Sequence, residues 1–187
     1  VIGEGGVQVN LRGERFWDES QGYSEAARAV LGQPEGVAWT IFDDRIAAIA
    51  RQFQDFKDAE AQGAVKTAAT VVELAAVTGL PQQKLARSLS TIDQGSTDSL
   101  GRRFAGPPLA PPYAAVKVTG ALFHTQGGLN VDEQARVKRG DGSVFPNLFA
   151  AGGAAVGVSG RGDSGYLSGN GLLSAVVLGR IAGQSAA

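Results

Sequence analysis

Very few residues of this chain carry side chains that could do chemistry on their own. His124 is the only imidazole, and it precedes the polar turn Thr125-Gln-Gly-Gly128. A lone histidine is more often a hydrogen-bonded structural residue than a catalyst, although the adjoining turn makes a functional role more credible. The absence of cysteine excludes a thiolate nucleophile, an iron–sulfur cluster and cysteine-bound zinc. A single histidine also leaves no room for a multi-histidine metal site.

A stronger binding feature is the predicted start of a helix near Asn170, which follows a segment with eight glycines in residues 152–171. The first N–H groups of a helix have no partner within it, and glycines let a ligand approach the backbone closely. The partial positive charge of a helix N-terminus suits a phosphate, or an electron-rich heterocycle that gains negative charge on reduction. The alternative is that these glycines serve only to let the chain pack tightly, and this explains the glycine-rich segment equally well.

Residues 160–165 also match the pattern GxGxxG of dinucleotide-binding proteins. That fingerprint requires a helix that begins inside the motif and an acidic residue about 20 positions later. Position 185 is serine and the chain is nearly over, so a chance match in a Gly-rich segment is the better interpretation. The tripeptide Arg161-Gly-Asp163 spells a cell-adhesion sequence, which we also interpret as coincidence.

Size and composition indicate an ordinary folded protein. The chain has 187 residues, of which 43% are apolar and 19% charged, and its formal net charge is −1. These fractions are near globular averages, and no charge run points to nucleic acid. The weakly charged segment 164–187 contains Arg180 and several glycines, so it predicts a buried helix and no membrane span. The sequence shows no signal-peptide pattern, and we expect a cytoplasmic protein.

The first half of the chain predicts mostly helices around a few strands. Thr70 and Glu73 form a capping-box pattern at the start of a helix that ends at Gly79. Periodicity and turn residues predict the other elements: a β-hairpin over 6–9 and 14–17, helices over 24–31, 44–62 and 81–90, and a strand over 37–42.

A proline-rich stretch, residues 106–112, is the clearest boundary in the chain, because it interrupts all regular structure. Strand candidates follow it, with the turn Asp141-Gly142 between two of them. They cover residues 116–118, 129–131, 136–138 and 148–151. Residues 171–184 are apolar almost all round and predict an interior helix.

Three stretches together resemble a known family. They are Gly13-Glu-Arg-Phe-Trp-Asp-Glu19, Ala121-Leu-Phe-His-Thr-Gln-Gly-Gly128, and the run from Asn147-Leu-Phe-Ala-Ala-Gly-Gly153 to Gly165-Tyr-Leu-Ser-Gly-Asn-Gly-Leu-Leu173. In this order and spacing they resemble the flavoprotein subunits of the fumarate reductase and succinate dehydrogenase superfamily. That superfamily includes the 3-ketosteroid delta-1-dehydrogenases.

The resemblance implies FAD as cofactor and an α+β fold. A helical, mixed capping domain would be joined to the C-terminal β-strands and buried helix of a Rossmann-like FAD-binding domain. Residues 1–12 would end an FAD-domain segment, 13–115 would form the capping (substrate) domain, and 116–187 the C-terminal part of the FAD-binding domain. The family's N-terminal Rossmann unit has no counterpart here, and the chain has no methionine, so we expect a fragment.

Three departures from the fumarate reductases bear on the substrate. Phe123 stands where those enzymes have a substrate-binding histidine, Tyr166 where they have a substrate arginine, and Tyr23 where they have a proton-shuttling arginine. A dicarboxylate would lose its bidentate charged partners at these positions. The resemblance therefore disfavours fumarate or succinate as substrate.

The ketosteroid dehydrogenases have tyrosine at both arginine positions. By resemblance, Tyr23 would abstract a proton from carbon, and Tyr166 would hydrogen-bond the substrate carbonyl together with the backbone N–H of Asn170. A phenol has an ordinary pKa of about 10, so Tyr23 needs a nearby cation such as Arg15. Phe123 would contact the substrate. Cofactor contacts would come from His124, Thr125, Gly152, Gly153, Gly171, Leu172 and Leu173, with Gly153 replacing the family's common glutamate.

Three functions remain open at this stage. The first is FAD-dependent dehydrogenation of a C–C bond next to a carbonyl, with hydride passing to flavin N5. The second is a fumarate reductase-like or tricarballylate dehydrogenase-like enzyme acting on a carboxylate. In the third, the isolated fragment is inactive and its cap is a binding module. We expect a small-molecule carbonyl or carboxylate partner, no nucleic acid, and self-association through the apolar face left by the missing N-terminal part.

Overall fold

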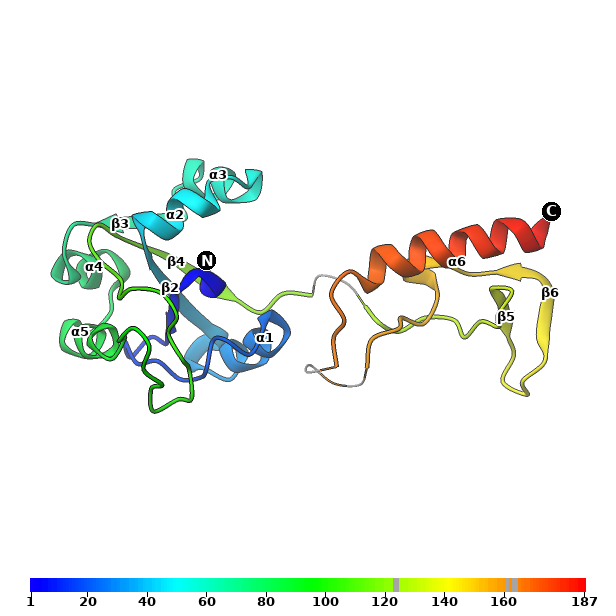
Figure 1. Ribbon diagram of the computed structural model, residues 1–187, viewed down its shortest axis with the longest axis horizontal. Helices are drawn as coiled ribbons and strands as arrows, with labels where there is room; N and C mark the ends of the chain where they lie inside the picture. Colours follow the sequence, from blue (N-terminus) through cyan, green and yellow to red (C-terminus); the bar gives the residue numbers. More distant parts are fainter. Residues whose placement is uncertain (123–124, 161, 163–164) are drawn as a thin grey trace. The chain divides into compact units, whose positions relative to one another are not determined.

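The computed structural model describes residues 1–122, 125–160, 162 and 165–187, and it divides into two compact units (Figure 1). Unit 1 is Val1–Gly120 and unit 2 is Ala121–Ala187. Both contain helices and antiparallel strands, which confirms the expected α+β class. The predicted limit between 115 and 116 falls inside a strand, and the assignment of ranges to capping and FAD domains stays a prediction.

Unit 1 is built on a four-stranded antiparallel sheet in the order β1-β2-β4-β3. The strands are β1 (Val7–Val9), β2 (Val37–Asp43), β4 (Tyr113–Thr119) and β3 (Val65–Ala68). β2 is buried from Ala38 to Asp43, because both faces of the sheet are covered. Successive side chains of a strand point to opposite faces, so Ile41 and Phe42 enter different cores.

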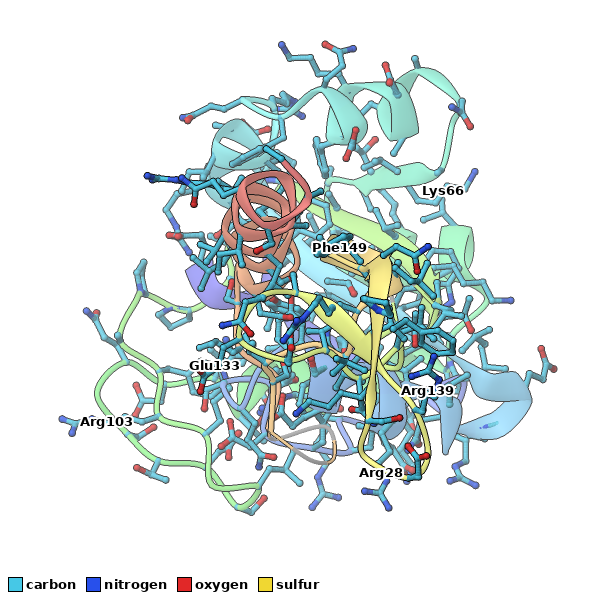
Figure 2. The ribbon with its side chains drawn as sticks, turned by 90° about the vertical axis from the view of Figure 1, so that its right-hand side faces the viewer. Arg28, Lys66, Arg103, Glu133, Arg139 and Phe149 are labelled. Atoms are coloured by element: carbon cyan, nitrogen blue, oxygen red, sulfur yellow. The ribbon has the colours of Figure 1, made fainter. Side chains whose placement is uncertain are left out.

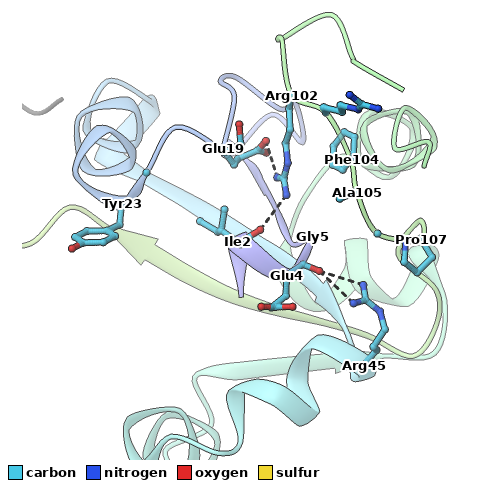
Figure 3. A pocket seen from close by; sticks show the side chains of 15 residues that line it. Ile2, Glu4, Gly5, Glu19, Tyr23, Arg45, Arg102, Phe104, Ala105 and Pro107 are labelled. Carbon is cyan, nitrogen blue, oxygen red and sulfur yellow. Dashed lines mark hydrogen bonds and ion pairs between the residues drawn. The ribbon is translucent and has the colours of Figure 1, made fainter. Parts of the chain in front are cut away.

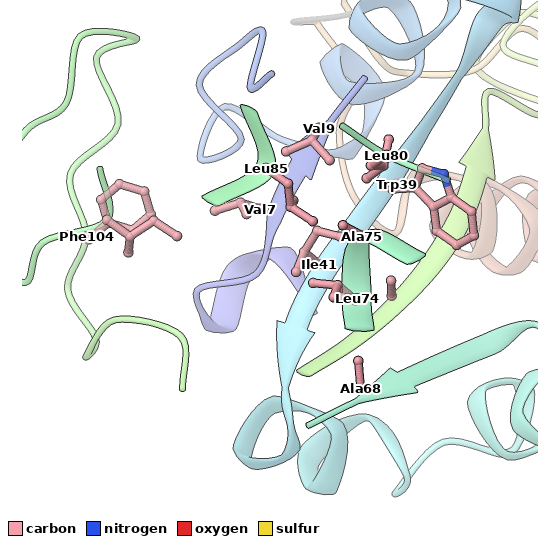
Figure 4. Packing of buried hydrophobic residues seen from close by; sticks show 12 residues of the cluster. Val7, Val9, Trp39, Ile41, Ala68, Leu74, Ala75, Leu80, Leu85 and Phe104 are labelled. Atoms are coloured by element: carbon pink, nitrogen blue, oxygen red, sulfur yellow. The ribbon is translucent and has the colours of Figure 1, made fainter. Parts of the chain in front are cut away.

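Helices cover both faces of this sheet. α4 (Val71–Thr78) and α5 (Gln82–Ser90) bury Leu74 and Leu85 against β1 and β2, as Figure 4 shows. α2 (Asp44–Ala50) and α3 (Gln54–Ala61) contribute Ile46 and Phe56 to the other core, where the Phe42 and Phe56 ring centroids are 5.9 Å apart. The remaining elements are α1 (Tyr23–Leu31) and the short 3-10 helices η1 (Ile2–Glu4) and η2 (Pro34–Gly36).

Local capping signals in unit 1 are confirmed. Thr70 Oγ1 accepts a hydrogen bond from the Glu73 N–H at 3.1 Å, and Glu73 in turn accepts one from the Ala69 N–H at 2.8 Å. Gly79 ends the helix in the left-handed conformation, with φ of 72°. This geometry needs only neighbouring residues, which is why the sequence pattern predicts it well.

Two predicted elements of unit 1 differ in the structure. The helix predicted over 44–62 is broken, because Phe53 adopts an extended conformation and is 65% exposed, although helical spacing assigned it to the buried face. The predicted hairpin is reduced to the single bridge Val9–Arg15, and β1 pairs with the distant strand β2. The sequence analysis did not predict β3, whose Lys66 and Thr67 are exposed.

Unit 2 contains an antiparallel pair, β5 (Arg136–Lys138) and β6 (Val144–Phe149), then η3 (Gly152–Ala154) and α6 (Asn170–Ala186). Its small core holds Val137, Ala150 and Ala155. The strand predicted over 129–131 is present only as isolated bridges, and the one predicted over 148–151 begins and ends earlier, as β6. Charged side chains such as Arg139 and Glu133 lie on the surface of this unit (Figure 2).

α6 has the predicted position, but its apolar side chains are largely exposed within this chain. Leu172 is 79% and Val176 is 71% exposed, whereas only Asn170 and Ser174 are buried. The small core of unit 2 offers no surface large enough to cover the apolar circumference of this helix. No helix in the described part of the chain is long and apolar enough to cross a membrane.

A buried ion-pair network joins distant parts of unit 1. The Glu19 carboxylate has no exposed side-chain surface and accepts hydrogen bonds from Arg15 Nε at 2.9 Å and Arg15 Nη2 at 2.6 Å. It also accepts from Arg102 Nη1 at 3.0 Å and from the Gln8 N–H at 2.9 Å. Arg15 Nη1 pairs in addition with Asp98. Two guanidinium groups are thus balanced by two carboxylates.

Arg102 extends this network to the N-terminal segment. Its Nη1 donates to the carbonyl of Gly6 at 2.8 Å and its Nη2 to that of Ile2 at 3.1 Å. The ring of Phe104 lies beneath both guanidinium groups, 4.6 Å from Arg102 Cζ and 5.1 Å from Arg15 Cζ. The network therefore holds residues 2–8, 15–19 and 98–104 together.

Removing the central carboxylate leaves two buried guanidinium groups with only the Asp98 carboxylate to balance them, so we expect Glu19→Gln to lower the free energy of unfolding by about 3–5 kcal/mol. Urea unfolding measures the change. Glu14→Gln is the control, because the Glu14–Lys84 pair is half exposed and such pairs contribute about 0–1 kcal/mol. Equal losses in the two variants would contradict the role given to the network.

The network also predicts a pH dependence. Burial by itself raises the pKa of the Asp98 carboxyl, but the hydrogen bond and charge of Arg15 and the backbone N–H groups of Arg102 and Leu100 outweigh it, and the pKa is lowered below its ordinary value of 3.8. Asp98 therefore stabilises the fold above that value, and this contribution is lost as the pH falls through the lowered pKa. Asp98→Asn should flatten the acid limb of the stability curve.

Candidate functional site

A cavity of about 650 Å³ opens in unit 1, and Figure 3 shows its walls. It lies between the N-terminal segment, the start of α1, the start of α2 and the loop after α5. Besides glycine, alanine and proline, its lining side chains are Ile2, Glu4, Glu19, Ser20, Tyr23, Arg45, Arg102, Arg103 and Phe104. This volume is in the range of about 300–1,000 Å³ that is typical of small-molecule sites.

Tyr23, one of the two predicted catalytic tyrosines, lies in this lining. It is the first residue of α1 and its side chain is 65% exposed. Gly22 caps the helix with φ of 140°, and a Cβ there would lie 2.7 Å from Glu25 Oε2. Only glycine suits that conformation, so Gly22 determines how the chain enters α1 and where Tyr23 stands.

The charge of the cavity wall is mostly compensated near Tyr23. Arg102 and Glu19 are both buried and neutralise each other within the ion-pair network. Arg15, which the sequence suggested as a cation for Tyr23, is instead held by Glu19 and Asp98. The other charged side chains of the wall, Arg45, Arg103 and Glu4, are more exposed, and Arg45 Nε lies 3.8 Å from the buried Asp43 carboxylate.

The structure brings together three segments of unit 2 that belong to or adjoin the family motifs. The Leu129 N–H donates to the carbonyl of Ala154 at 2.8 Å, and the Gly157 N–H donates to that of Gln126 at 3.0 Å. A Cβ on Gly157 would lie 2.1 Å from Gln126 Oε1 and 3.3 Å from Asn170 Oδ1. Residues 125–129, 152–157 and the start of α6 thus form one cluster, although they are distant in sequence.

The start of α6 has N–H groups that are available to a ligand. Asn170 N–H donates to Leu167 O at 3.2 Å and Leu173 N–H to Gly169 O at 3.0 Å, while the N–H groups of Gly171 and Leu172 have no acceptor among the described residues. No atom lies within 4 Å of a Cβ built on Gly171. This open backbone fits an electron-rich ring that gains negative charge on reduction.

The other predicted site residues are placed as follows. Gly152 (φ 56°) packs on α6, where its Cβ would lie 3.2 Å from Ala175 Cβ, and beside Gly153 the space is open. Thr125 is exposed and accepts from the Gly127 N–H at 3.1 Å. Tyr166 is half-buried, and Asn170 is 2% exposed. Phe123 and His124 lie outside the described residues, as do Arg161, Asp163 and Ser164 of the glycine motif.

Tyr23 belongs to unit 1 and Tyr166 to unit 2, so their joint action stays a prediction.

The sequence analysis missed the arginines of the cavity, Arg45, Arg102 and Arg103. No spacing signal connects them with Tyr23, because Arg45 lies 22 positions and the other two arginines about 80 positions later in the chain, and only the sheet brings them together.

Comparison with known proteins decides the family. A family model described as "FAD binding domain" matches residues 1–172.

The chain belongs to the FAD binding domain family. Membership confirms the expected resemblance and FAD as the cofactor, and the open backbone at α6 fits that group.

Relatives in this family include both enzyme types that the sequence suggested. A probable fumarate reductase of Shewanella frigidimarina is 36% identical over all of this chain, which spans 32% of that protein. A 3-oxosteroid 1-dehydrogenase of Mycobacterium tuberculosis is 30% identical over 84% of this chain and 34% of its own length. The chain thus spans about a third of the length of these relatives.

Solved structures show the same two groups. A flavocytochrome c3 fumarate reductase in its open conformation matches 98% of this chain and 32% of its own, with a TM-score of 0.73 and 32% identity. The 3-ketosteroid-Δ4-(5α)-dehydrogenase of Rhodococcus jostii matches 97% of this chain and 38% of its own, with a TM-score of 0.58 and 26% identity. Relatives and structures therefore leave the substrate type unresolved.

Proposed function

We propose that the full-length protein is an FAD-dependent oxidoreductase that dehydrogenates a C–C bond next to a carbonyl. The observation that carries the proposal is Tyr23 in the wall of a cavity sized for a small molecule. The buried cation in that wall, Arg102, is already neutralised by Glu19. A phenol and a compensated wall suit an uncharged reacting carbonyl better than a dicarboxylate.

In this proposal Tyr23 removes the proton from the carbon next to the carbonyl. Tyr166 and the Asn170 N–H donate hydrogen bonds to the carbonyl oxygen and stabilise the enolate that forms. The Asn170 N–H now bonds Leu167 O at 3.2 Å, so it would share its proton between the two acceptors. FAD, when bound, supplies the hydride acceptor for the adjacent carbon.

We assign the holding of FAD to unit 2. Gly171, Leu172 and Leu173 present the first turn of α6, whose N-terminus favours negative charge on the flavin. Gly152 lets the chain pack closely on that helix, and Gly153 leaves open space for the cofactor. Thr125 and His124 complete the predicted contacts from the polar turn.

Removing either hydroxyl should lower kcat about 10²–10⁴-fold if it takes part in proton transfer or carbonyl polarisation. The test uses Tyr23→Phe and Tyr166→Phe in the full-length protein with a 3-ketosteroid and an artificial electron acceptor.

Tyr113→Phe is the matched control, because this third tyrosine lies in β4 and packs against the core of unit 1. It should keep normal turnover. Normal turnover of both the Tyr23 and the Tyr166 variants would remove the catalytic assignment.

A second candidate is reduction of a C=C bond activated by a carboxylate, as the name of the 36% identical relative suggests for that protein. Fumarate reduction by the full-length protein with reduced viologen tests it. Turnover of fumarate that greatly exceeds dehydrogenation of ketones would favour this candidate over the first.

We further propose that the isolated chain self-associates through α6, because Leu172, Leu173 and Val176 are more than half exposed on it. Leu172→Gln combined with Val176→Gln should reduce the apparent mass in sedimentation experiments. Val72→Gln, an exposed valine on α4, is the control and should leave the mass unchanged. A monomer at all concentrations would contradict self-association.

A further inference from the structure

The side-chain oxygen of Gln126 is a buried hydrogen-bond acceptor without a donor. Among the described residues, Gln126 Oε1 is the one buried side-chain nitrogen or oxygen atom that has no hydrogen-bond partner. It lies directly against the backbone of Gly157, since a Cβ built on that glycine would overlap it. The Gly157 N–H also donates to the Gln126 carbonyl at 3.0 Å, so the two residues are held together. An unpaired buried acceptor is costly, and this position therefore calls for a donor.

A second amide oxygen lies beside the same point. Asn170 Oδ1 would be 3.3 Å from a Cβ on Gly157, and Asn170 is buried. The orientation of the Asn170 amide is determined at its other end, because Nδ2 donates to the Leu167 carbonyl at 3.0 Å. Two acceptor oxygens thus lie near one point. A half-turn of the Gln126 carboxamide, whose oxygen and nitrogen ends have nearly the same shape, places an N–H donor there instead.

Asn170 is the first residue of α6, where a ligand can reach the backbone. The N–H groups of Gly171 and Leu172 have no acceptor among the described residues, and the space beside Gly171 is open. Asn170 holds the preceding turn, because its backbone N–H and its Nδ2 both donate to the Leu167 carbonyl. A donor to Asn170 Oδ1 restrains the other end of this side chain and with it the first turn of the helix.

We propose that Gln126 is a positioning residue whose Nε2 donates to Asn170 Oδ1 and thereby holds the open N–H groups of Gly171 and Leu172 toward FAD. The inference rests on the proposed FAD contact at α6 and is independent of the substrate. N–H groups at a helix N-terminus favour negative charge, so they stabilise reduced FAD more than oxidised FAD. Gln126 acts on the cofactor through Asn170.

The midpoint potential of FAD in the full-length protein, measured by spectroelectrochemical titration, tests the proposal without turnover. Gln126→Met keeps the length of the side chain but removes the donor. It should weaken the binding of reduced FAD about tenfold more than that of oxidised FAD, which for a two-electron couple lowers the potential by about 30 mV. Gln126→Leu is a second variant with the same expectation. A residue that only fills space would change both affinities equally and leave the potential unchanged.

Asn170→Ala removes the acceptor of the same hydrogen bond and should lower the potential by a similar amount. The double variant with Gln126→Met should lower it little further, because both residues act through one contact. Gln134→Met is the matched control, since Gln134 is exposed in unit 2, and it should keep the wild-type potential. A wild-type potential in the Gln126 variants, or losses that add in the double variant, would overturn the proposal.

Leu172→Pro tests the FAD contact at α6 separately. Proline removes the Leu172 N–H without breaking a bond within the helix, because that N–H has no acceptor among the described residues. A lower potential in Leu172→Pro with a wild-type potential in Gln126→Met would contradict this inference and leave the FAD contact in place. Wild-type potentials in both variants would contradict both. Failure of the proposed dehydrogenation would not affect this measurement, since no substrate takes part in it.

Discussion

A single buried carboxylate, that of Glu19, organises unit 1. It accepts hydrogen bonds from Arg15, Arg102 and the backbone of Gln8, and its side chain has no exposed surface. A buried charge is costly unless it is paired and hydrogen-bonded, so the residues around it have little freedom to separate. Arg102 carries the constraint on to the carbonyls of Ile2 and Gly6. Segments without regular structure are held in place in this way.

The same pairing explains the character of the cavity. Glu19, Arg102 and Phe104 belong to both the network and the lining, so the ion pairs that hold the fold also form one wall. Because the charges of Glu19 and Arg102 compensate each other, that wall is polar but neutral. Tyr23 follows four residues after Glu19, on a helix whose start is determined by Gly22. Stability and a candidate site are therefore linked through a few shared residues.

Unit 2 depends on backbone contacts more than on charge. Gly128 and Gly157 have almost no room for a Cβ, because Ala155 and Gln126 lie directly against them. Gly153 and Gly171 have open space beside them instead. The N–H groups of Gly171 and Leu172, which have no acceptor among the described residues, lie at the start of α6. The sequence suggested two roles for the glycine-rich segment, close packing and access for a ligand. Both occur there, but at different glycines.

Local features of this protein follow from the sequence, since they depend on residues a few positions apart. The capping box of Thr70 and Glu73, the strand 37–42 and the position of α6 are of this kind, as is the family-typical order of the motifs. Pairing of β1 with β2, the break at Phe53 and the grouping of Arg102 with Glu19 depend on contacts between distant residues. Sequence periodicity carries no information about such contacts, because many partners satisfy the same apolar or ionic requirement. Only packing in three dimensions selects one partner, and it does so by burying the charges and apolar surfaces that a wrong pairing would leave uncompensated.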